Sequence, residues 1–364
     1  MAIVLSVIIY CCFGGLVESI ESGFYLIIFL FLAVGCLIFP AGPFEHPHPI
    51  IYRLIFGISL LYAFFLLMLL SQSPDNARGL LGKIFNDEEL GKPLKTRNYA
   101  TDCSISYEVL SSMVDRFILA HFLGWMVKAL IIRDRLILWI LSVLWELIEL
   151  STAFFIPNFA ECWWDQWILD VTLCNAFGIE FGLWITRKYF SHPERNWLGK
   201  EKKIFSFNNM CLKVKRLAIQ FTPTSITPMQ WSPFKDIKRY YQIHLLILCG
   251  TLIDFNSFIL KLFLFIPTEH ILNLYRLIIM CPFFVISCKQ YYLFLTNKKC
   301  KKMGSQTWVG FVILVLEIAL CIKCRPRPFP KVPYENIICW IIGSISYLLF
   351  TYVYFRDVSK VKVN

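Results

Sequence analysis

The chain has 364 residues, of which 57% are hydrophobic and 17% are charged, and its mean hydropathy is +0.60. Soluble globular domains have about half apolar and about a quarter charged residues, so this composition excludes an ordinary soluble enzyme. The formal net charge is +11. It does not indicate nucleic-acid binding, because the chain has no soluble basic module with aromatic platforms.

Long apolar runs predict the fold class, an all-α polytopic integral membrane protein. Each run is long enough to cross the roughly 30 Å of bilayer hydrocarbon, and the runs are too long and too uniformly apolar for barrel strands. Because no repeat or low-complexity linker divides the chain, residues 1–364 are expected to form a single membrane domain, with an acidic catalytic core at about 114–190. About ten transmembrane helices are expected, at residues 2–18, 23–40, 50–71, 114–132, 135–157, 164–188, 240–266, 269–287, 306–323 and 336–355.

The distribution of basic residues predicts the orientation. The segment from Arg187 to Arg239 contains 12 Lys and Arg residues against three acids, and basic loops favour the cytosolic side. With ten spans, this rule places both termini in the cytosol and the turn at 158–165 on the lumenal or external side. The basic loop after the ninth span, residues 323–331, breaks the pattern.

The 14 cysteines lie mostly in apolar segments, and no C-x-x-C pair is repeated at a zinc-binding spacing. We therefore expect reduced thiols that pack as small hydrophobic side chains.

The fifth and sixth spans contain an unusual acidic segment, residues 146–175. Glu146 and Glu149 are three residues apart and share one helix face. Pro157 is expected to end their helix. Further along, Asp165, Asp170 and Asn175 follow one another at five-residue intervals. On an α-helix, each of these side chains would point about 140° away from the one before it around the helix axis.

These acids are costly in a membrane. A carboxylate near the middle of a span costs about 2.5–3.5 kcal/mol, and no Lys or Arg lies between Glu146 and Asp170. Either the carboxyl groups are protonated or they bind a cation. Carboxylate and amide oxygens suit the hard cations Ca²⁺, Mg²⁺ and Mn²⁺. The alternative is that the acids cap helices or lie at the wet interface, which fits Glu161 and Asp165 best.

His121 lies in the fourth span. A single histidine in a membrane helix commonly forms an interhelical hydrogen bond. Beside a carboxylate-bound cation it becomes a candidate general base, because neutral imidazole accepts protons near pH 7.

Several motifs resemble the base-exchange phosphatidylserine synthases, in plant-like members and in animal types 1 and 2. The resemblance runs from about residue 39 to 325, and GKPLKTRNYATDC is closer to the plant-like members. The matching segments are FPAGPFEHPHP, HFLGWMVKALIIR, WELIEL, PNFAECWWDQWILDVTLCN, KRLAIQFTPTS and KQYYLFLTNKKCKKMGSQTWVGF.

The resemblance implies a multi-pass enzyme of the endoplasmic reticulum membrane. It would exchange the choline or ethanolamine headgroup of phosphatidylcholine or phosphatidylethanolamine for L-serine, require Ca²⁺ and use no CTP. A homodimer is an open alternative to a monomer.

The resemblance also implies roles for individual residues. Two motifs depart from the family pattern. The family's R-P-H motif is His46-Pro47-His48 here, so histidine replaces its arginine. The family's R-Q-Y-Y motif is Lys289-Gln290-Tyr291-Tyr292 here, so lysine replaces its arginine. Lysine offers a point charge where arginine offers a bidentate fork. The implied residues are His121, Glu146 and Asp170 for catalysis, Glu146, Glu149, Asn158, Glu161 and Asp165 for the metal, Asn175, Lys289, Gln290 and Tyr291 for substrate, and His46 and His48 for regulation.

Exchange at a phosphodiester needs a cation to offset charge on the phosphate and a base to take the serine proton. We assign these tasks to the acidic segment and to His121. The H-x-K-x₄-D signature of phospholipase D and the D-x₂-D-G-x₂-A-R signature of CDP-alcohol phosphotransferases are both absent. A cation-coupled transporter is the alternative from another class, but it would be expected to show paired repeats. A third alternative is a lipid-binding protein without catalytic activity.

Overall fold

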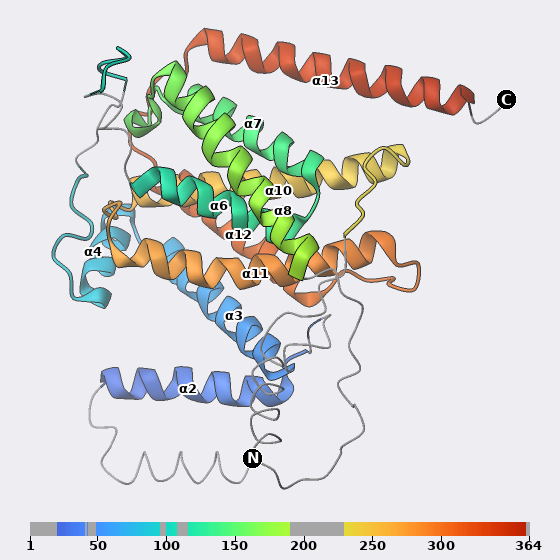
Figure 1. Ribbon diagram of the computed structural model, residues 1–364. Coiled ribbons are helices and arrows are strands. Elements are labelled where there is room, and N and C mark those ends of the chain that lie inside the picture. Colours follow the sequence, from blue (N-terminus) through green and yellow to red (C-terminus); the bar gives the residue numbers. More distant parts are fainter. Residues whose placement is uncertain are drawn as a thin grey trace, which may run out of the picture. The chain divides into compact units, whose positions relative to one another are not determined.

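The computed structural model describes residues 20–40, 42, 49–94, 100–107, 116–189 and 229–361. Every regular element within these ranges is a helix (Figure 1), which confirms the all-α prediction. The expected first span, residues 2–18, lies outside the described residues. The helices are α2 (Ile20–Ile38), α3 (Pro49–Ser71), α4 (Pro74–Phe85), α6 (Arg116–Ile132), α7 (Arg135–Thr152), η1 (Pro157–Phe159), η2 (Asp165–Asn175), α8 (Ala176–Tyr189), α10 (Ile237–Phe263), α11 (Ile271–Thr296), α12 (Ser305–Cys324) and α13 (Tyr334–Val361).

Six helical segments among the described residues are long and apolar enough to cross a membrane. They are α3, the continuous η2–α8 segment, α10, α11, α12 and α13. The apolar stretches of α2 and α6 are shorter, and α7 carries Arg135, Glu146 and Glu149 among its apolar residues. These findings are consistent with a polytopic membrane protein. The total of about ten spans stays a prediction.

The helix boundaries follow the expected spans closely except at the ends of α7, α11 and α13, and α13 runs to Val361, beyond the expected end at 355. The helix α7 ends at Thr152, and Pro157 begins the short 3₁₀ turn η1 instead of ending α7. Proline suits the first position of a helical turn, where its missing N–H has no partner to lose. The helix α11 continues to Thr296, beyond the expected end at 287.

The chain divides into two compact units. Unit 1 comprises residues 1–71, 190–227 and 271–316, and unit 2 comprises residues 72–189, 228–270 and 317–364. In unit 1, α3 packs against α2 and α11, with Tyr52 and Ile286 buried between α3 and α11. Unit 2 contains α6, α7, η2, α8 and α10, and therefore carries both His121 and the acidic segment.

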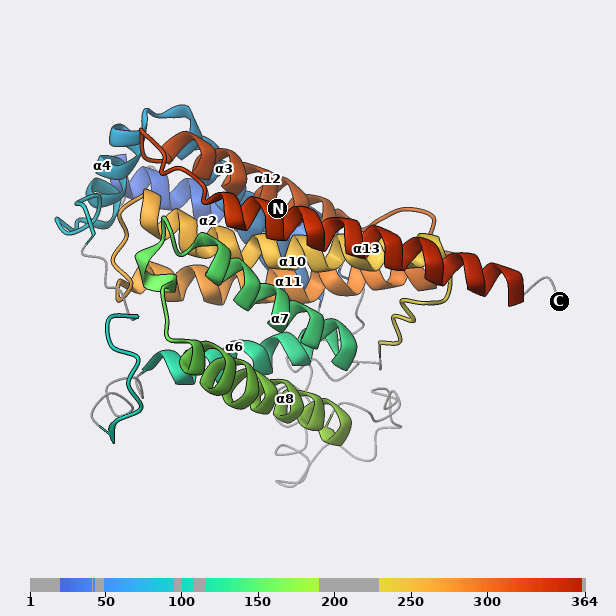
Figure 2. The ribbon, with the colours of Figure 1, turned by 90° about the horizontal axis from the view of Figure 1, so that it is seen from above.

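Two glycines bring α8 against α6, and Figures 1 and 2 show these helices side by side. A Cβ atom at Gly178 would lie 2.5 Å from the Phe122 carbonyl oxygen, and one at Gly182 would lie 2.6 Å from that of Met126. The pair forms a G-x-x-x-G motif, which lets membrane helices approach at backbone distance. Because α8 continues directly from η2, this packing fixes α6 against the acidic segment.

The connections of unit 2 gather at two ends. At one end, Arg78 donates to the carbonyl oxygens of Phe263 (2.8 Å) and Cys324 (3.0 Å), and His270 Nε2 lies 3.0 Å from Asp87 Oδ2. At the other end, Trp231 Nε1 donates to the Ile132 carbonyl oxygen at 2.9 Å. With the predicted ten spans, the connections that meet at each end would lie on the same side of a membrane.

The α6–α8 contact gives the first testable prediction. Replacing Gly182 with leucine should lower the melting temperature of the detergent-purified protein, because overpacking typically costs about 1–3 kcal/mol. The position of His121 against the acidic segment should be disturbed with it, since α6 carries His121. Gly124→Leu is the matched control, because a Cβ at Gly124 meets open space. Equal melting temperatures for Gly182→Leu and the wild type would contradict the prediction.

Candidate active site

The acidic residues of the sixth span lie on a π-helix. Residues Asp165–Asn175 form this 11-residue element, in which backbone bonds join residues five apart. Residues at five-residue intervals therefore lie on roughly the same face of this helix. The expected rotation of about 140° per step is wrong for this segment, because that value holds for an α-helix. Asp170 and Asn175 are buried, with 7% and 0% of their surface exposed.

The helix α7 contributes Glu146 and Glu149, both buried as the shared-face prediction requires. The Asn175 side-chain amide donates to Glu146 Oε1 at 3.0 Å and to Ser142 Oγ at 3.0 Å. The Gln166 side chain donates to the backbone carbonyl of Glu146 at 3.1 Å. Three amide and hydroxyl side chains thus tie η2 to α7. Neither Ser142 nor Gln166 was expected at the site.

His121 of α6 lies against the same cluster. Its Nδ1 atom is 3.2 Å from Asp170 Oδ1, an ion-pair distance, although the two groups are not aligned as a hydrogen bond. A carboxylate at Nδ1 orients an imidazole and leaves Nε2 to accept a proton. Asp170 is thus the carboxylate that orients the His121 imidazole.

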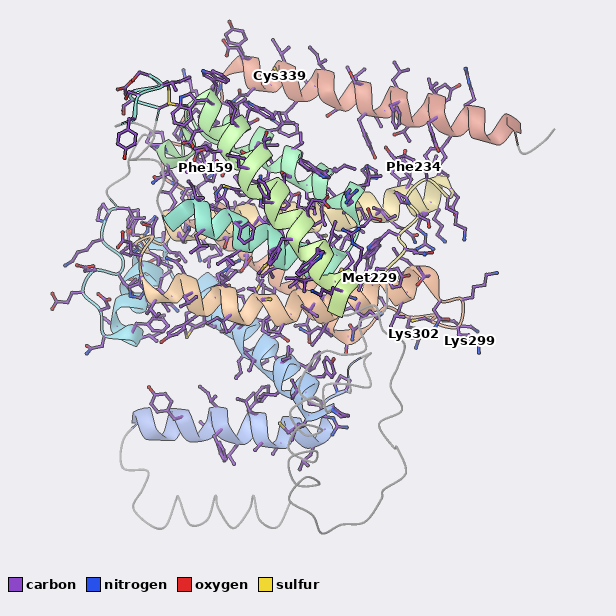
Figure 3. The ribbon with its side chains drawn as sticks, viewed as in Figure 1. Phe159, Met229, Phe234, Lys299, Lys302 and Cys339 are labelled. Atoms are coloured by element: carbon purple, nitrogen blue, oxygen red, sulfur yellow. A yellow bond between two sulfur atoms is a disulfide. The ribbon has the colours of Figure 1, made fainter. Side chains whose placement is uncertain are left out.

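The turn between α7 and η2 adds Asn158, which lies in η1, and Glu161; both are partly buried. Burial raises the pKa of Glu161 to about 9, and the charges of Asp170 and Asp165 act in the same direction. The carboxyl group is therefore protonated near neutral pH unless a cation approaches it. Phe159 holds this turn in place (Figure 3), with ring centroids 6.1 Å from Trp145 of α7 and 5.1 Å from Phe258 of α10.

The cluster contains buried oxygen atoms without a donor. Four acceptors have no hydrogen-bond partner: one carboxylate oxygen each of Glu146, Glu149 and Glu161, and the side-chain oxygen of Asn175. Buried polar atoms without partners are uncommon, and oxygen atoms of these types are ligands of hard cations. Among the described residues, no three acidic, imidazole or thiol side chains already stand as a preformed metal centre. The types of oxygen atom present therefore suit a hard cation. To coordinate one, these side chains would have to move closer together.

A disulfide links the acidic turn to an earlier loop. Cys103 and Cys162 are bonded across 59 residues of sequence, and Trp164 Nε1 donates to the Cys103 carbonyl oxygen at 3.3 Å. The prediction of reduced thiols is therefore wrong for this pair and holds for the nine other cysteines described. No local spacing signals a pair so far apart in sequence. Disulfides persist in oxidising compartments, which agrees with a lumenal or external turn.

The expected substrate residues of α11 lie in unit 1. Lys289 and Tyr291 are buried. The Gln290 side-chain oxygen accepts from the Thr307 backbone N–H at 3.0 Å and its hydroxyl at 3.2 Å. Gln290 therefore ties α11 to the first turn of α12, and its role toward substrate stays a prediction. His46 and His48 lie outside the described residues.

Together, fold and site define a helical membrane protein with a buried carboxylate and imidazole centre. A sequence profile described as phosphatidyl serine synthase matches residues 47–325. The chain is 35% identical to phosphatidylserine synthase of Drosophila melanogaster, covering 95% of this chain and 70% of that protein. It is 34% identical to phosphatidylserine synthase 1 of Danio rerio, covering 93% and 72%. It is also 34% identical to CDP-diacylglycerol--serine O-phosphatidyltransferase 2 of Oryza sativa subsp. japonica, covering 91% and 79%.

The chain belongs to the phosphatidylserine synthase family. It is thus a phosphatidyltransferase of phospholipid biosynthesis, as its motifs suggested.

The disulfide gives the second prediction. Cys103→Ser should lower the melting temperature and the activity, because closing a loop of 59 residues contributes up to about 4 kcal/mol in the chain-entropy account. Reductant should have the same effect on the wild type and no further effect on Cys103→Ser. Cys339→Ser, which removes an exposed free thiol, is the control. A wild-type melting curve unchanged by reductant would contradict the prediction.

Proposed function

We propose that the protein makes phosphatidylserine by Ca²⁺-dependent base exchange, in which L-serine replaces the ethanolamine or choline headgroup of a phospholipid. The observation that carries the proposal is the cluster of four unpartnered buried oxygens beside the His121–Asp170 pair. It combines the two things that exchange at a phosphodiester requires, a place for a cation and a base.

In the proposed reaction, the serine hydroxyl oxygen forms a bond to phosphorus, and the bond from phosphorus to the headgroup alcohol breaks. His121 Nε2 accepts the serine proton, while Asp170, 3.2 Å from Nδ1, stabilises the imidazolium that results. The proton then passes to the departing alkoxide, so the free alcohol leaves and His121 returns to its neutral form.

The residues that would hold the cation are Glu146, Glu149, Asn158, Glu161 and Asp165. When bound, Ca²⁺ would offset the negative charge that develops on the phosphate oxygens. Ca²⁺ accepts six to eight oxygen ligands in adaptable geometry, whereas Mg²⁺ demands a near-ideal octahedron and keeps several waters. A set of neighbouring carboxylates that must still close on the ion is better suited to Ca²⁺.

The relatives' names point to two chemical routes. The name of the Oryza relative specifies CDP-diacylglycerol as the phosphatidyl donor, whereas the Drosophila and Danio names specify no donor. We favour base exchange, because the chain lacks the D-x₂-D-G-x₂-A-R signature of CDP-alcohol phosphotransferases. A cation-coupled transporter is less compatible with membership of this family, and the acidic hairpin has no repeat elsewhere in the sequence.

The proposed setting is the endoplasmic reticulum membrane, with both termini cytosolic and the acidic turn facing the lumen. The Cys103–Cys162 disulfide beside that turn supports the orientation, because the lumen of this organelle oxidises thiols. A homodimer remains part of the prediction.

The first experiment measures incorporation of labelled L-serine into phospholipid by microsomes that contain the protein. Incorporation should require Ca²⁺, stop on addition of a chelator, and proceed without CTP or CDP-diacylglycerol. Ethanolamine or choline should be released in equal amount, since each exchange frees one alcohol. Incorporation only when CDP-diacylglycerol is supplied would establish the other route.

His121→Ala should lower serine exchange at least a hundredfold, because general-base catalysis typically contributes about 10²–10⁴-fold. The variant should largely retain Ca²⁺ binding, which is measured as the increase in melting temperature that Ca²⁺ gives the purified protein. His244→Ala is the matched control, since that histidine bonds to the Tyr240 carbonyl on its own helix (2.8 Å). Retained exchange in His121→Ala would remove this residue from the mechanism.

A further inference from the structure

A second charged pair lies in unit 2, apart from the acidic cluster. Lys128 Nζ of α6 is 2.8 Å from Asp254 Oδ2 of α10. Asp254 lies inside the α10 span, and Lys128 lies inside the apolar stretch of α6. Ionisable residues at such positions are costly and commonly mark a substrate or ion pathway. Neither residue has a task in the reaction described above.

Lys128 stands on the same face of α6 as His121. The two residues are seven apart, which is close to two full turns of an α-helix. Long helical side chains lean toward the helix N-terminus, and Lys128 does so, because its Nζ lies 4.1 Å from the ring centroid of Trp125. The lysine therefore leans toward His121, and its charge acts on the His121 imidazole.

The pair is accessible. The Lys128 and Asp254 side chains are 24% and 31% exposed, although both lie within apolar helices. Exposure to hydrocarbon would be costly for either charge, so the accessible side faces a polar space. Packing alone gives no reason for the pair, because buried ion pairs are often no more stabilising than apolar side chains of similar volume.

The chemistry of the pair matches one ligand in the reaction. A lipid phosphate would be attracted by Lys128 but repelled by the Asp254 carboxylate 2.8 Å away. Free serine carries an ammonium and a carboxylate on one carbon atom, and therefore complements both charges. Ethanolamine and choline carry only the cation, so Lys128 is the group that distinguishes serine from the alcohols it replaces.

We propose that Lys128 and Asp254 form the recognition site for free L-serine, with Lys128 binding its carboxylate and Asp254 its ammonium group. Bound in this way between α6 and α10, serine directs its hydroxyl along α6 toward His121. This assignment rests on the base exchange proposed above and names the residues that select its incoming substrate.

The test compares two acceptors. Base exchange is reversible, so the proposed reaction predicts that ethanolamine also serves as acceptor when phosphatidylserine is the donor. In Lys128→Gln, the ratio of kcat/KM for serine to that for ethanolamine should fall about tenfold to a hundredfold, the effect of losing one charged hydrogen bond. In Asp254→Asn, both values should fall, because both acceptors carry an ammonium group. An unchanged serine-to-ethanolamine ratio in Lys128→Gln would overturn the assignment.

A charge-reversed double variant separates recognition from structural support. Lys128→Asp with Asp254→Lys keeps the ion pair between α6 and α10 but exchanges the positions of the two charges. Serine exchange should stay impaired while the melting temperature recovers. Full recovery of the serine KM would show that the pair only holds the helices together. Lys188→Gln, on α8 and over the Trp184 ring (4.7 Å), is the single-lysine control and should keep wild-type kinetics.

A direct measurement of serine binding tests the recognition site independently of the exchange reaction. Labelled serine in equilibrium dialysis with the purified full-length protein should bind to the wild type and lose affinity in Lys128→Gln. If the wild type binds serine in this manner without exchanging it, the proposed function fails and the recognition site stands. If the wild type exchanges serine and Lys128→Gln binds it equally well, the recognition site fails alone.

Discussion

The rest of unit 2 depends on one constraint, which is that carboxylates cannot remain charged and unpaired among apolar helices. Glu146, Glu149 and Asp170 are all buried, and each meets this constraint differently. Glu146 accepts from the Asn175 amide, and Asp170 lies beside the His121 imidazole. Glu149 and Glu161 keep oxygen atoms without a donor. The helices are therefore arranged around carboxyl groups that need a neutral donor, a proton or a cation beside them.

Much of this organisation could be predicted from the sequence, because it depends on hydrophobicity and on the number of residues. Apolar runs gave the helices α3, α6 and α12 to within two residues of their observed ends. The spacing of Glu146 and Glu149 placed both on one buried face of α7. The cost of dehydrating carboxylates marked the segment that contains the site, and the motifs around it indicated the family.

Other features could not be predicted, since they depend on contacts between distant residues or on unusual backbone geometry. The π-helix of Asp165–Asn175 brings residues five apart onto roughly one face, and no propensity scale anticipates it. Lys128 and Asp254 are far apart in the sequence, and each resembles an isolated charge until α6 meets α10. The G-x-x-x-G spacing of Gly178 and Gly182 was a readable signal that indicates close helix packing.

The position of the disulfide also bears on how the protein matures. Cys103 precedes the acidic turn in the chain, and its partner Cys162 directly follows Glu161. The bond can form only after the later helices have been inserted and both loops have reached the same oxidising side of the membrane. Newly made chains therefore pass through a stage in which the turn is untethered. The disulfide thus ties the acidic turn to the earlier loop only once α6 and α7, which lie between the two cysteines, are in place.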